Sequence, residues 1–314
     1  MIYYAVDGIR KETIPQLFLI KTICRIFHLN GGMRMRIGFI GAGKVGFSLG
    51  RYLRDKGFEV TGYFSRSMDS AKEAAEFTGT NSFSSLAELV DSSDTIFITV
   101  SDGAIHSVWS QLKEIGISDR VICHCSGVLS SEVFSDITEY NCFGYSIHPL
   151  LAVSSRYNSY REFSNTLFTI EGHESRIEEM TSLIRKCGNK VVRIKAGDKT
   201  RYHGAAVMAS NLVLGLFETA VSELMCCGFD REDAIEALGP LMCGNVDHLR
   251  TQTLEESLTG PVERADSETI IKHLEVFEGE NKEIYRLLSK KAIKIAKRKN
   301  IGRNYQKVEE ILNE

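Results

Sequence analysis

The chain has 314 residues, with 38 lysines and arginines against 41 aspartates and glutamates, and a formal net charge of -3. A charge this close to balance gives no indication of nucleic acid or an anionic membrane as a partner. The eight cysteines lack paired spacing, which is typical of reduced thiols in a cytoplasmic protein, and the length allows two domains with cores of their own.

Residues 1–34 precede the first element of the predicted fold. Their apolar part, Ile14 to Phe27, is interrupted by a proline and two basic residues, so it is too short and too charged for a membrane-spanning helix and makes a poor signal peptide. Met33 and Met35 stand immediately before the first predicted strand. Two interpretations stay open, a start assigned too far upstream and a short accessory helix.

A glycine-rich turn follows the first predicted strand, Ile37 to Ile40, and leads into a helical pattern. In this context the first glycine permits a tight turn, the second lets the backbone approach phosphates, and the third lets the helix pack close to the sheet. The N–H groups at the start of the helix then face the anion. We therefore expect the diphosphate of a dinucleotide to bind Gly41, Ala42, Gly43, Lys44, Val45 and Gly46.

The end of the second predicted strand, Glu59 to Phe64, indicates which dinucleotide binds. An NAD site usually places an acidic residue here to hold the ribose 2′-hydroxyl, but this chain has Ser65, Arg66 and Ser67. A guanidinium between hydroxyls can accept a 2′-phosphate, which a carboxylate would repel. The sequence therefore favours NADP, with a solvated Arg66 as the alternative.

Three further runs, Thr95 to Val100, Arg120 to His124 and Gly144 to His148, have the apolar, β-branched character of strands in a parallel sheet. The first of these runs ends at a loop, Ser101-Asp102-Gly103, and open α/β sheets bind ligands at the carboxyl ends of their strands. The residues expected to contact the cofactor there are Ser101, Asp102 and Ser126.

Two more strands are predicted, Leu167 to Glu171 and Val191 to Lys195, and after Gly197 helical patterns dominate. The predicted helices are Lys199 to Cys227, Arg231 to about Cys243, Ser267 to Phe277 and Asn281 to Lys299. The predicted fold class is α/β, with a Rossmann-type, mostly parallel sheet in residues 35–196 and an all-helical substrate and dimerisation domain in residues 197–314.

Cys123-His124-Cys125 is a candidate metal site. On a strand the two cysteines share one face while His124 points away, and no second pair of ligands has a suitable spacing, so we expect packing thiols and no metal. A zinc enzyme that uses Cys123, Cys125 and His148 is the alternative.

Several motifs together resemble a known family. They are the glycine-rich turn, Val100-Ser101-Asp102, Ser126-Gly127, Ser146-Ile147-His148-Pro149-Leu150, Lys199-x-x-Tyr202-His203, Ser210-Asn211, Gly260-Pro261-x-x-Arg264-x-Asp266 and His273-Leu274. Over residues 35–300 the chain is similar to Rossmann-like oxidoreductases with a helical C-terminal domain of unknown function, which resemble pyrroline-5-carboxylate reductase, ketopantoate reductase and deazaflavin-dependent NADP reductases. The resemblance implies an NADP-type cofactor and a homodimer built through the helical domain. Members commonly have Arg-Gly-Asp where this chain has Ala265 between Arg264 and Asp266.

Lys199 and His203 are predicted one helical turn apart on one face, with Ser210 near that face two turns later. The related hydroxyacid dehydrogenases carry a lysine followed four residues later by an asparagine, whose place His203 takes. We expect Lys199 to donate a proton to a carbonyl or imine, with His203 as its partner or as the donor. The alternative is a surface lysine and a core histidine.

His148 is the second catalytic candidate, because the following proline keeps it extended at the carboxyl edge of the sheet. A packing role is the alternative. Arg264 and Asp266 could anchor a substrate carboxylate, or form an interdomain or intersubunit salt bridge. Ser210 and Asn211 complete the predicted substrate-binding residues.

The sequence thus favours a cytoplasmic NADPH-dependent oxidoreductase that transfers hydride to or from a small carbonyl or imine compound in the cleft between the domains. The alternative from another class is a sensor or regulatory protein that binds NADP without turnover. The sequence does not identify the substrate.

Overall fold

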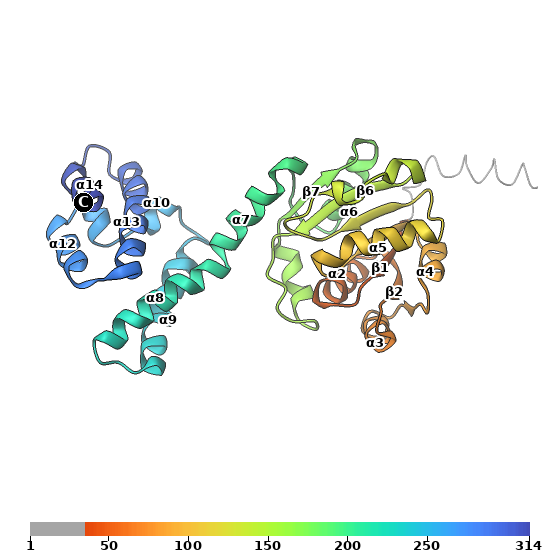
Figure 1. Cartoon of the computed structure of the whole chain (residues 1–314), viewed down its shortest axis with the longest axis horizontal. Coiled ribbons are helices and arrows are strands. Elements are labelled where there is room, and N and C mark those ends of the chain that lie inside the picture. Colours follow the sequence, from red (N-terminus) through yellow and green to blue (C-terminus); the bar gives the residue numbers. More distant parts are fainter. Residues whose placement is uncertain (1–34) are drawn as a thin grey trace, which may run out of the picture. The chain divides into compact units, whose positions relative to one another are not determined.

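A computed structural model describes residues 35–314. The chain divides into two compact units, the first ending at Gly204 and the second running from Ala205 to Glu314 (Figure 1). The predicted N-terminal extension, residues 1–34, lies outside the described residues. The predicted boundary at residue 197 falls just before the helix α7 (Lys199–Ala209), in which the two units divide.

An eight-stranded sheet organises the first unit, in the order β3-β2-β1-β4-β5-β6-β7-β8. All neighbouring strands pair in parallel except β6 and β7. The mostly parallel, Rossmann-like fold predicted from the sequence is confirmed. The strands are β1 Arg36–Ile40, β2 Glu59–Phe64, β3 Asn81–Ser82, β4 Thr95–Ile98, β5 Val121–His124, β6 Phe143–Pro149, β7 Phe168–Gly172 and β8 Val191–Arg193.

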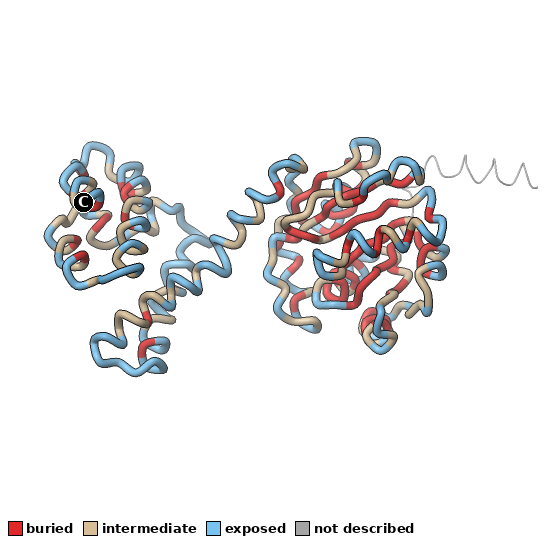
Figure 2. Tube along the Cα trace, viewed as in Figure 1, coloured by how far each residue is buried: buried red, intermediate tan, exposed pale blue. Residues whose placement is uncertain are grey.

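Helices cover both faces of this sheet, because side chains of alternate residues leave each strand on opposite faces. Phe39 and Phe97 belong to one core, and Ile40, Ile96 and Ile98 to the other. Figure 2 shows the resulting burial along the central strands. The helices are α2 Lys44–Asp55, α3 Met68–Thr78, α4 Leu86–Ser92, α5 Asp102–Glu114 and α6 Ile177–Lys186, with short 3-10 turns at η1 Ser131–Val133, η2 Ile137–Tyr140, η3 Ser159–Asn165, η4 Glu174–Arg176 and η5 Ala196–Asp198.

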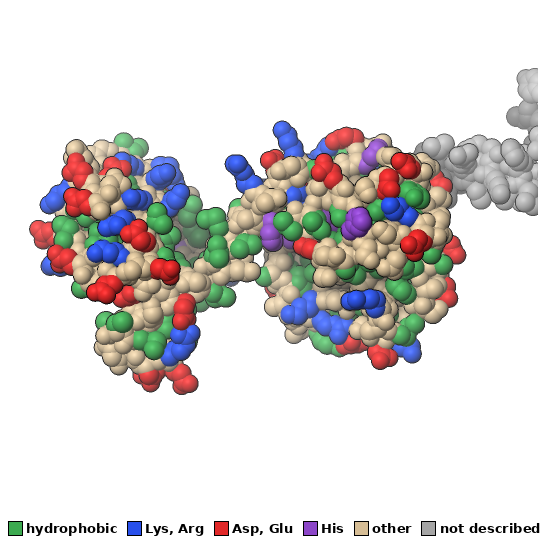
Figure 3. All heavy atoms as spheres, in the orientation of Figure 1, with side chains coloured by type: hydrophobic (Ala, Val, Ile, Leu, Met, Phe, Trp, Pro, Cys, Tyr) green, Lys and Arg blue, Asp and Glu red, His purple; other side chains and the backbone are tan. Residues whose placement is uncertain are grey.

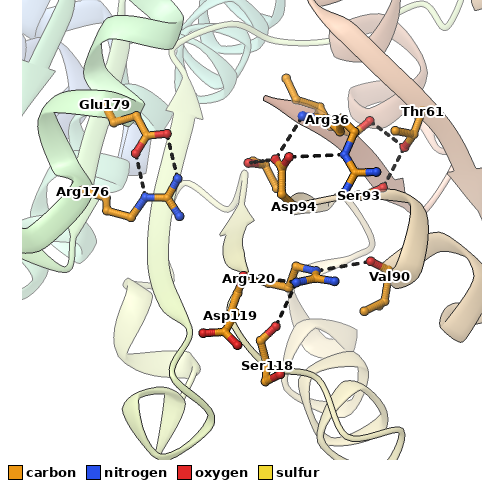
Figure 4. Close-up of polar contacts among 12 residues, drawn as sticks. Arg36, Thr61, Val90, Ser93, Asp94, Ser118, Asp119, Arg120, Arg176 and Glu179 are labelled. Carbon is orange, nitrogen blue, oxygen red and sulfur yellow. Dashed lines mark hydrogen bonds and ion pairs between the residues drawn. The ribbon is translucent and has the colours of Figure 1, made fainter. Parts of the chain in front are cut away.

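Polar contacts tie the strands together around their amino ends (Figure 4). The backbone N–H of Arg36 donates to Asp94 over 3.0 Å, and its guanidinium lies 3.5 Å from the same carboxylate. The hydroxyls of Thr61 and Ser93 lie 2.7 Å apart. These contacts connect β1 and β2 with the segment before β4 and have a structural role at the edge opposite the glycine-rich turn.

The second unit is helical, as predicted. Its elements are α8 Asn211–Cys226, α9 Arg231–His248, α10 Leu254–Ser257, α11 Pro261–Arg264, α12 Ser267–Val276, α13 Gly279–Lys299 and α14 Gln306–Asn313. The helices α11 to α14 enclose a core of their own, formed by Val262, Ile270, Leu274, Ile293, Ala296, Tyr305, Val308 and Leu312.

The structure corrects three details of the sequence prediction. The single helix expected from Lys199 to Cys227 is broken at Ser210, whose hydroxyl donates to the Ala206 carbonyl over 2.8 Å. Serine hydroxyls that bond back to the preceding turn favour bends in helices. The loop expected at Ser101 to Gly103 is the start of α5, and α9 continues through Pro240 as far as His248.

Ala265 ends α11 in the left-handed conformation, with φ at 61°. Glycine adopts this conformation with little steric cost, whereas a β-carbon costs roughly 1–2 kcal/mol. The glycine that the family resemblance implies at this position would remove this cost.

The stretch Ala196–Cys226 has the length and composition of a membrane-spanning helix, with a mean hydropathy of 1.5. Soluble proteins contain such helices too. Here Lys199, near its beginning, is buried in the first unit, and the break at Ser210 interrupts the stretch. Its apolar residues are concentrated in α8, of which only Val221 is buried.

Candidate active site

The pairing of four parallel strands places several functional candidates at one edge of the sheet. Ile40, Ile98, His124 and Ser146 are aligned partners across β1, β4, β5 and β6. The residues that follow each of them therefore meet at the carboxyl edge, where sheets of this type bind ligands.

The glycine-rich turn leaves this edge from β1. Gly41 has a φ of 104°, and a β-carbon there would lie 2.9 Å from the backbone of Thr99. Gly46 packs against the Thr99 side chain, which leaves no room for a β-carbon. The Thr99 hydroxyl donates to the Gly41 carbonyl over 2.8 Å and holds the turn. The start of α2 thereby faces the space beyond β1 with free N–H groups.

A cavity of about 360 Å³ lies beside this turn. Six of the predicted cofactor-binding residues line it, namely Gly41, Ala42, Gly43, Ser65, Arg66 and Ser101. Other residues that line the cavity were not predicted from the sequence, including Leu86 of α4 and Ala104, Ser107, Val108 and Gln111 of α5. The i, i+3, i+4 and i+7 spacing of the last four would have been the signal that one face of a helix lines the site.

The remaining predicted cofactor residues lie around the cavity without lining it. In the first turn of α2, Lys44 is exposed and Val45 is partly buried, and Asp102 is the exposed first residue of α5. The Ser67 hydroxyl accepts from the N–H of Ser70 over 3.3 Å and caps α3. Ser126 is buried after β5.

The loop after β5 is shaped by the buried His124. Its Nδ1 accepts from the N–H of Ser126 over 3.1 Å, so its Nε2 carries the proton and donates to the Ser130 carbonyl over 3.1 Å. Burial lowers the pKa of His124 to about 4. The Ser126 hydroxyl accepts from the N–H of Leu129 over 3.0 Å. These bonds fix the position of Ser126 and the adjacent Gly127.

Lys199 is anchored beneath this loop. Only 2% of the residue is exposed, and its ammonium donates to the Ser126 carbonyl and to the Ser146 hydroxyl, each over 2.8 Å. Burial lowers its pKa to about 8, against opposing effects of Glu171 and other nearby groups. Lys199 therefore joins the start of α7 to the carboxyl ends of β5 and β6.

Two imidazoles converge on Gly127. A β-carbon at that glycine would lie 2.6 Å from Nδ1 of His203 and 3.0 Å from Nε2 of His148. The other ring nitrogen of His148, Nδ1, lies 2.7 Å from the Tyr202 hydroxyl. Burial, and then the charge of Lys199, lower the pKa of His148 to about 3. The structure thus gathers Lys199, His203, His148 and Ser126 in one cluster.

The predicted substrate-binding residues of the second unit have local contacts. The Asp266 carboxylate caps α12 by accepting from the N–H and hydroxyl of Thr269, and these bonds lower its pKa. Arg264 is exposed at the end of α11. Ser210 and Asn211 lie at the break between α7 and α8 and are exposed.

The zinc alternative has no ligand set in residues 35–314, where no group of three or more His, Cys, Asp and Glu residues is placed to hold a metal. Cys123 packs in the hydrophobic core on one face of the sheet. Burial raises the pKa of Cys125 to about 12, which disfavours the thiolate that zinc binds.

Two family models match the chain. Residues 36–124 match the family described as NADP oxidoreductase coenzyme F420-dependent, and residues 166–292 match Domain of unknown function DUF2520. Two parts of the chain are thus similar to an NADP oxidoreductase domain and to a DUF2520 domain, and the resemblance stated from its motifs is confirmed. A comparison with curated proteins gives no match.

Solved structures share the fold. Protein TM1727 from Thermotoga maritima is 26% identical, with a TM-score of 0.68 over 83% of this chain and 98% of that one. Pyrroline carboxylate reductase from Plasmodium falciparum, solved with NADP bound, is 16% identical, with a TM-score of 0.51 over 85% and 100%. An imine reductase from a Pseudomonas species is 17% identical, with a TM-score of 0.57 over 84% and 98%.

The buried His124 predicts a loss of stability in mild acid. Its pKa is about 4 in the folded chain and about 6.5 in the unfolded chain, so between these values only the unfolded chain takes up the proton. Its contribution to the free energy of unfolding therefore falls as pH falls from about 6.5 to 4, by up to about 1.4 kcal/mol per pH unit. Urea unfolding across this range should show a shallower pH dependence in H124Q.

The exposed His106 of α5 provides the matched control. H106Q should retain the pH dependence of the unmodified chain. An H124Q protein with the same dependence as the unmodified chain would contradict the assignment of a neutral, buried imidazole to His124.

Proposed function

We propose that the chain is an NADPH-dependent reductase of a small imine or carbonyl compound. One observation carries the proposal. The cavity beside the glycine-rich turn and the cluster around His148 lie at the same edge of the sheet. The match to an NADP oxidoreductase family and the fold shared with pyrroline carboxylate reductase and imine reductase support it.

Arg66 supports NADPH over NADH. Its guanidinium is exposed and lines the cavity next to Ser65, and none of the residues that line this cavity is acidic. A 2′-phosphate at that place would gain charge-assisted hydrogen bonds without facing a carboxylate. NADPH would supply the hydride, and the chain must supply a proton to the reduced oxygen or nitrogen.

His148 is the proton donor that the geometry supports best. It is half-buried at the carboxyl end of β6, and its Nε2 is free of the bond that holds Nδ1. Lys199 is less suited, because its ammonium is buried and directs two of its protons to Ser126 and Ser146. We propose that Lys199 holds the loop and that its positive charge favours negative charge developing on the substrate. His203 stays the alternative donor.

We propose a homodimer formed through the helical domain. Hydrophobic side chains gather over α7 and α8 in Figure 3, and Leu214 is 70% exposed. An apolar groove of about 410 Å³ runs between α8 and α13, with Leu216, Leu224 and Leu288 among its lining residues. Exposed apolar surface of this kind marks interaction sites in soluble proteins. A second copy of the chain is the partner that the family resemblance implies.

Sedimentation equilibrium should therefore give twice the mass of one chain, and L214E should shift the protein to the monomer by placing a charge in the interface. The matched control is K291E, at an exposed position of α13, which should keep the mass of the unmodified protein. A monomer at micromolar concentration in the unmodified protein would contradict the proposal.

Turnover distinguishes an enzyme from an NADP-binding sensor. The protein should oxidise NADPH with at least one member of a panel of cyclic imines and 2-keto acids, and H148Q should lower kcat by about 10²–10⁴, the usual contribution of a general acid. NADPH affinity should stay unchanged in H148Q, and H106Q should keep full activity. Binding of NADPH without oxidation by any member of the panel would favour the sensor.

Cofactor selectivity tests the role of Arg66. R66A should weaken NADPH binding about 10- to 100-fold, because charge-assisted hydrogen bonds contribute about 1.5–3 kcal/mol, and should leave NADH binding unchanged. Calorimetry with both cofactors measures this, with R54A on the exposed end of α2 as the control. An equal loss of affinity for the two cofactors would contradict recognition of the 2′-phosphate.

A further inference from the structure

The proposed proton donor, His148, is held by Tyr202. The Tyr202 hydroxyl lies 2.7 Å from Nδ1 of His148, and the two rings are 5.6 Å apart at an interplanar angle of 84°. His148 lies at the end of β6 and Tyr202 one turn into α7, so the bond joins the sheet edge to the helix. It therefore restricts rotation of the imidazole.

The surroundings of this pair determine which atom carries the proton. Burial and the nearby Lys199 ammonium keep the His148 ring neutral, so one of its nitrogens is an acceptor and the other a donor. The Lys199 ammonium lies 5.7 Å from the centre of the Tyr202 ring. A positive charge there favours a hydrogen bond in which the phenol donates its proton to Nδ1 over one in which the phenol oxygen accepts a proton from Nδ1.

Thr169 supplies an independent observation. It is the direct cross-strand partner of His148 on β7, and its buried hydroxyl forms no hydrogen bond that meets normal geometry within the described residues. Burial raises the pKa of Tyr202, whereas the nearby Thr169 side chain lowers it. An unpaired hydroxyl beside the phenol is free to donate to the phenol oxygen, which leaves the phenol proton for Nδ1.

We propose that Tyr202 is the positioning residue of His148: its hydroxyl donates to Nδ1 and so keeps the ring proton on Nε2, the nitrogen beside Gly127. In this tautomer Nε2 can give its proton to the substrate while Nδ1 takes up the phenol proton of Tyr202, so that the ring stays neutral and the phenolate regains a proton from solvent. The catalytic consequence rests on the proposed function, whereas the tautomer is a property of the folded chain.

Nitrogen NMR of protein labelled at histidine tests the tautomer directly, since the protonated and unprotonated ring nitrogens of a neutral imidazole have distinct shifts. The His148 signals, identified by their loss in H148Q, should show a proton on Nε2. In Y202F they should move towards a mixture of both tautomers. An unchanged His148 spectrum in a folded Y202F protein would overturn the proposal.

The helical unit offers a matched control. Nδ1 of His273 lies 2.8 Å from the Tyr285 hydroxyl, with the rings 5.4 Å apart at 89°. Y285F removes the same kind of bond and should change the signals of His273 while leaving those of His148 in place. A His148 spectrum that responds equally to Y202F and Y285F would reflect a general loosening of the fold and contradict the assignment.

Kinetics then test the consequence for catalysis. Y202F should lower kcat by at least about tenfold with little change in KM, and adding Y202F to H148Q should cause no further loss, because the tyrosine acts through the histidine. Additive losses would overturn the positioning role. If the unmodified protein reduces no substrate, the proposed function fails while the tautomer measurement still decides the assignment of Tyr202.

Discussion

The aligned parallel pairing of β1, β4, β5 and β6 is the constraint on which the rest of the site depends. It brings the glycine-rich turn, the loop after β5 and the end of β6 to the same edge, although more than a hundred residues of sequence separate Gly41 from His148. Local bonds then refine each position. Thr99 holds the turn at Gly41, and His124 shapes the loop that carries Ser126. The site is therefore a product of sheet register first and of individual side chains second.

Lys199 connects this edge to the rest of the chain. An ammonium as buried as this is costly unless acceptors satisfy it, and the Ser126 carbonyl and Ser146 hydroxyl do so. The same two bonds fix the beginning of α7 and hence the positions of Tyr202 beside His148 and of His203 beside Gly127. An anchoring role explains why a charged residue is buried here, and it separates the residue that builds the site from the histidine proposed to act in it.

The sequence predicted the architecture well, because long buried strands and a glycine-rich turn have strong local signals. It also placed Arg66 at the cavity, since the residue follows β2 directly. It could not predict the antiparallel β7, the break at Ser210 or the bond between His148 and Tyr202, because each depends on tertiary packing. The same holds for Lys199. Helical periodicity predicted its position on the helix, but the burial of its ammonium and its two hydrogen-bond acceptors could not be predicted.

The most direct test of the account is a crystal structure of the protein with NADP. The account predicts the diphosphate against the N–H groups at the start of α2, the 2′-phosphate beside Arg66, and the nicotinamide at the edge formed by Ser126 and His148. A nicotinamide bound away from His148, or a diphosphate that does not contact the turn from Gly41 to Gly46, would contradict it.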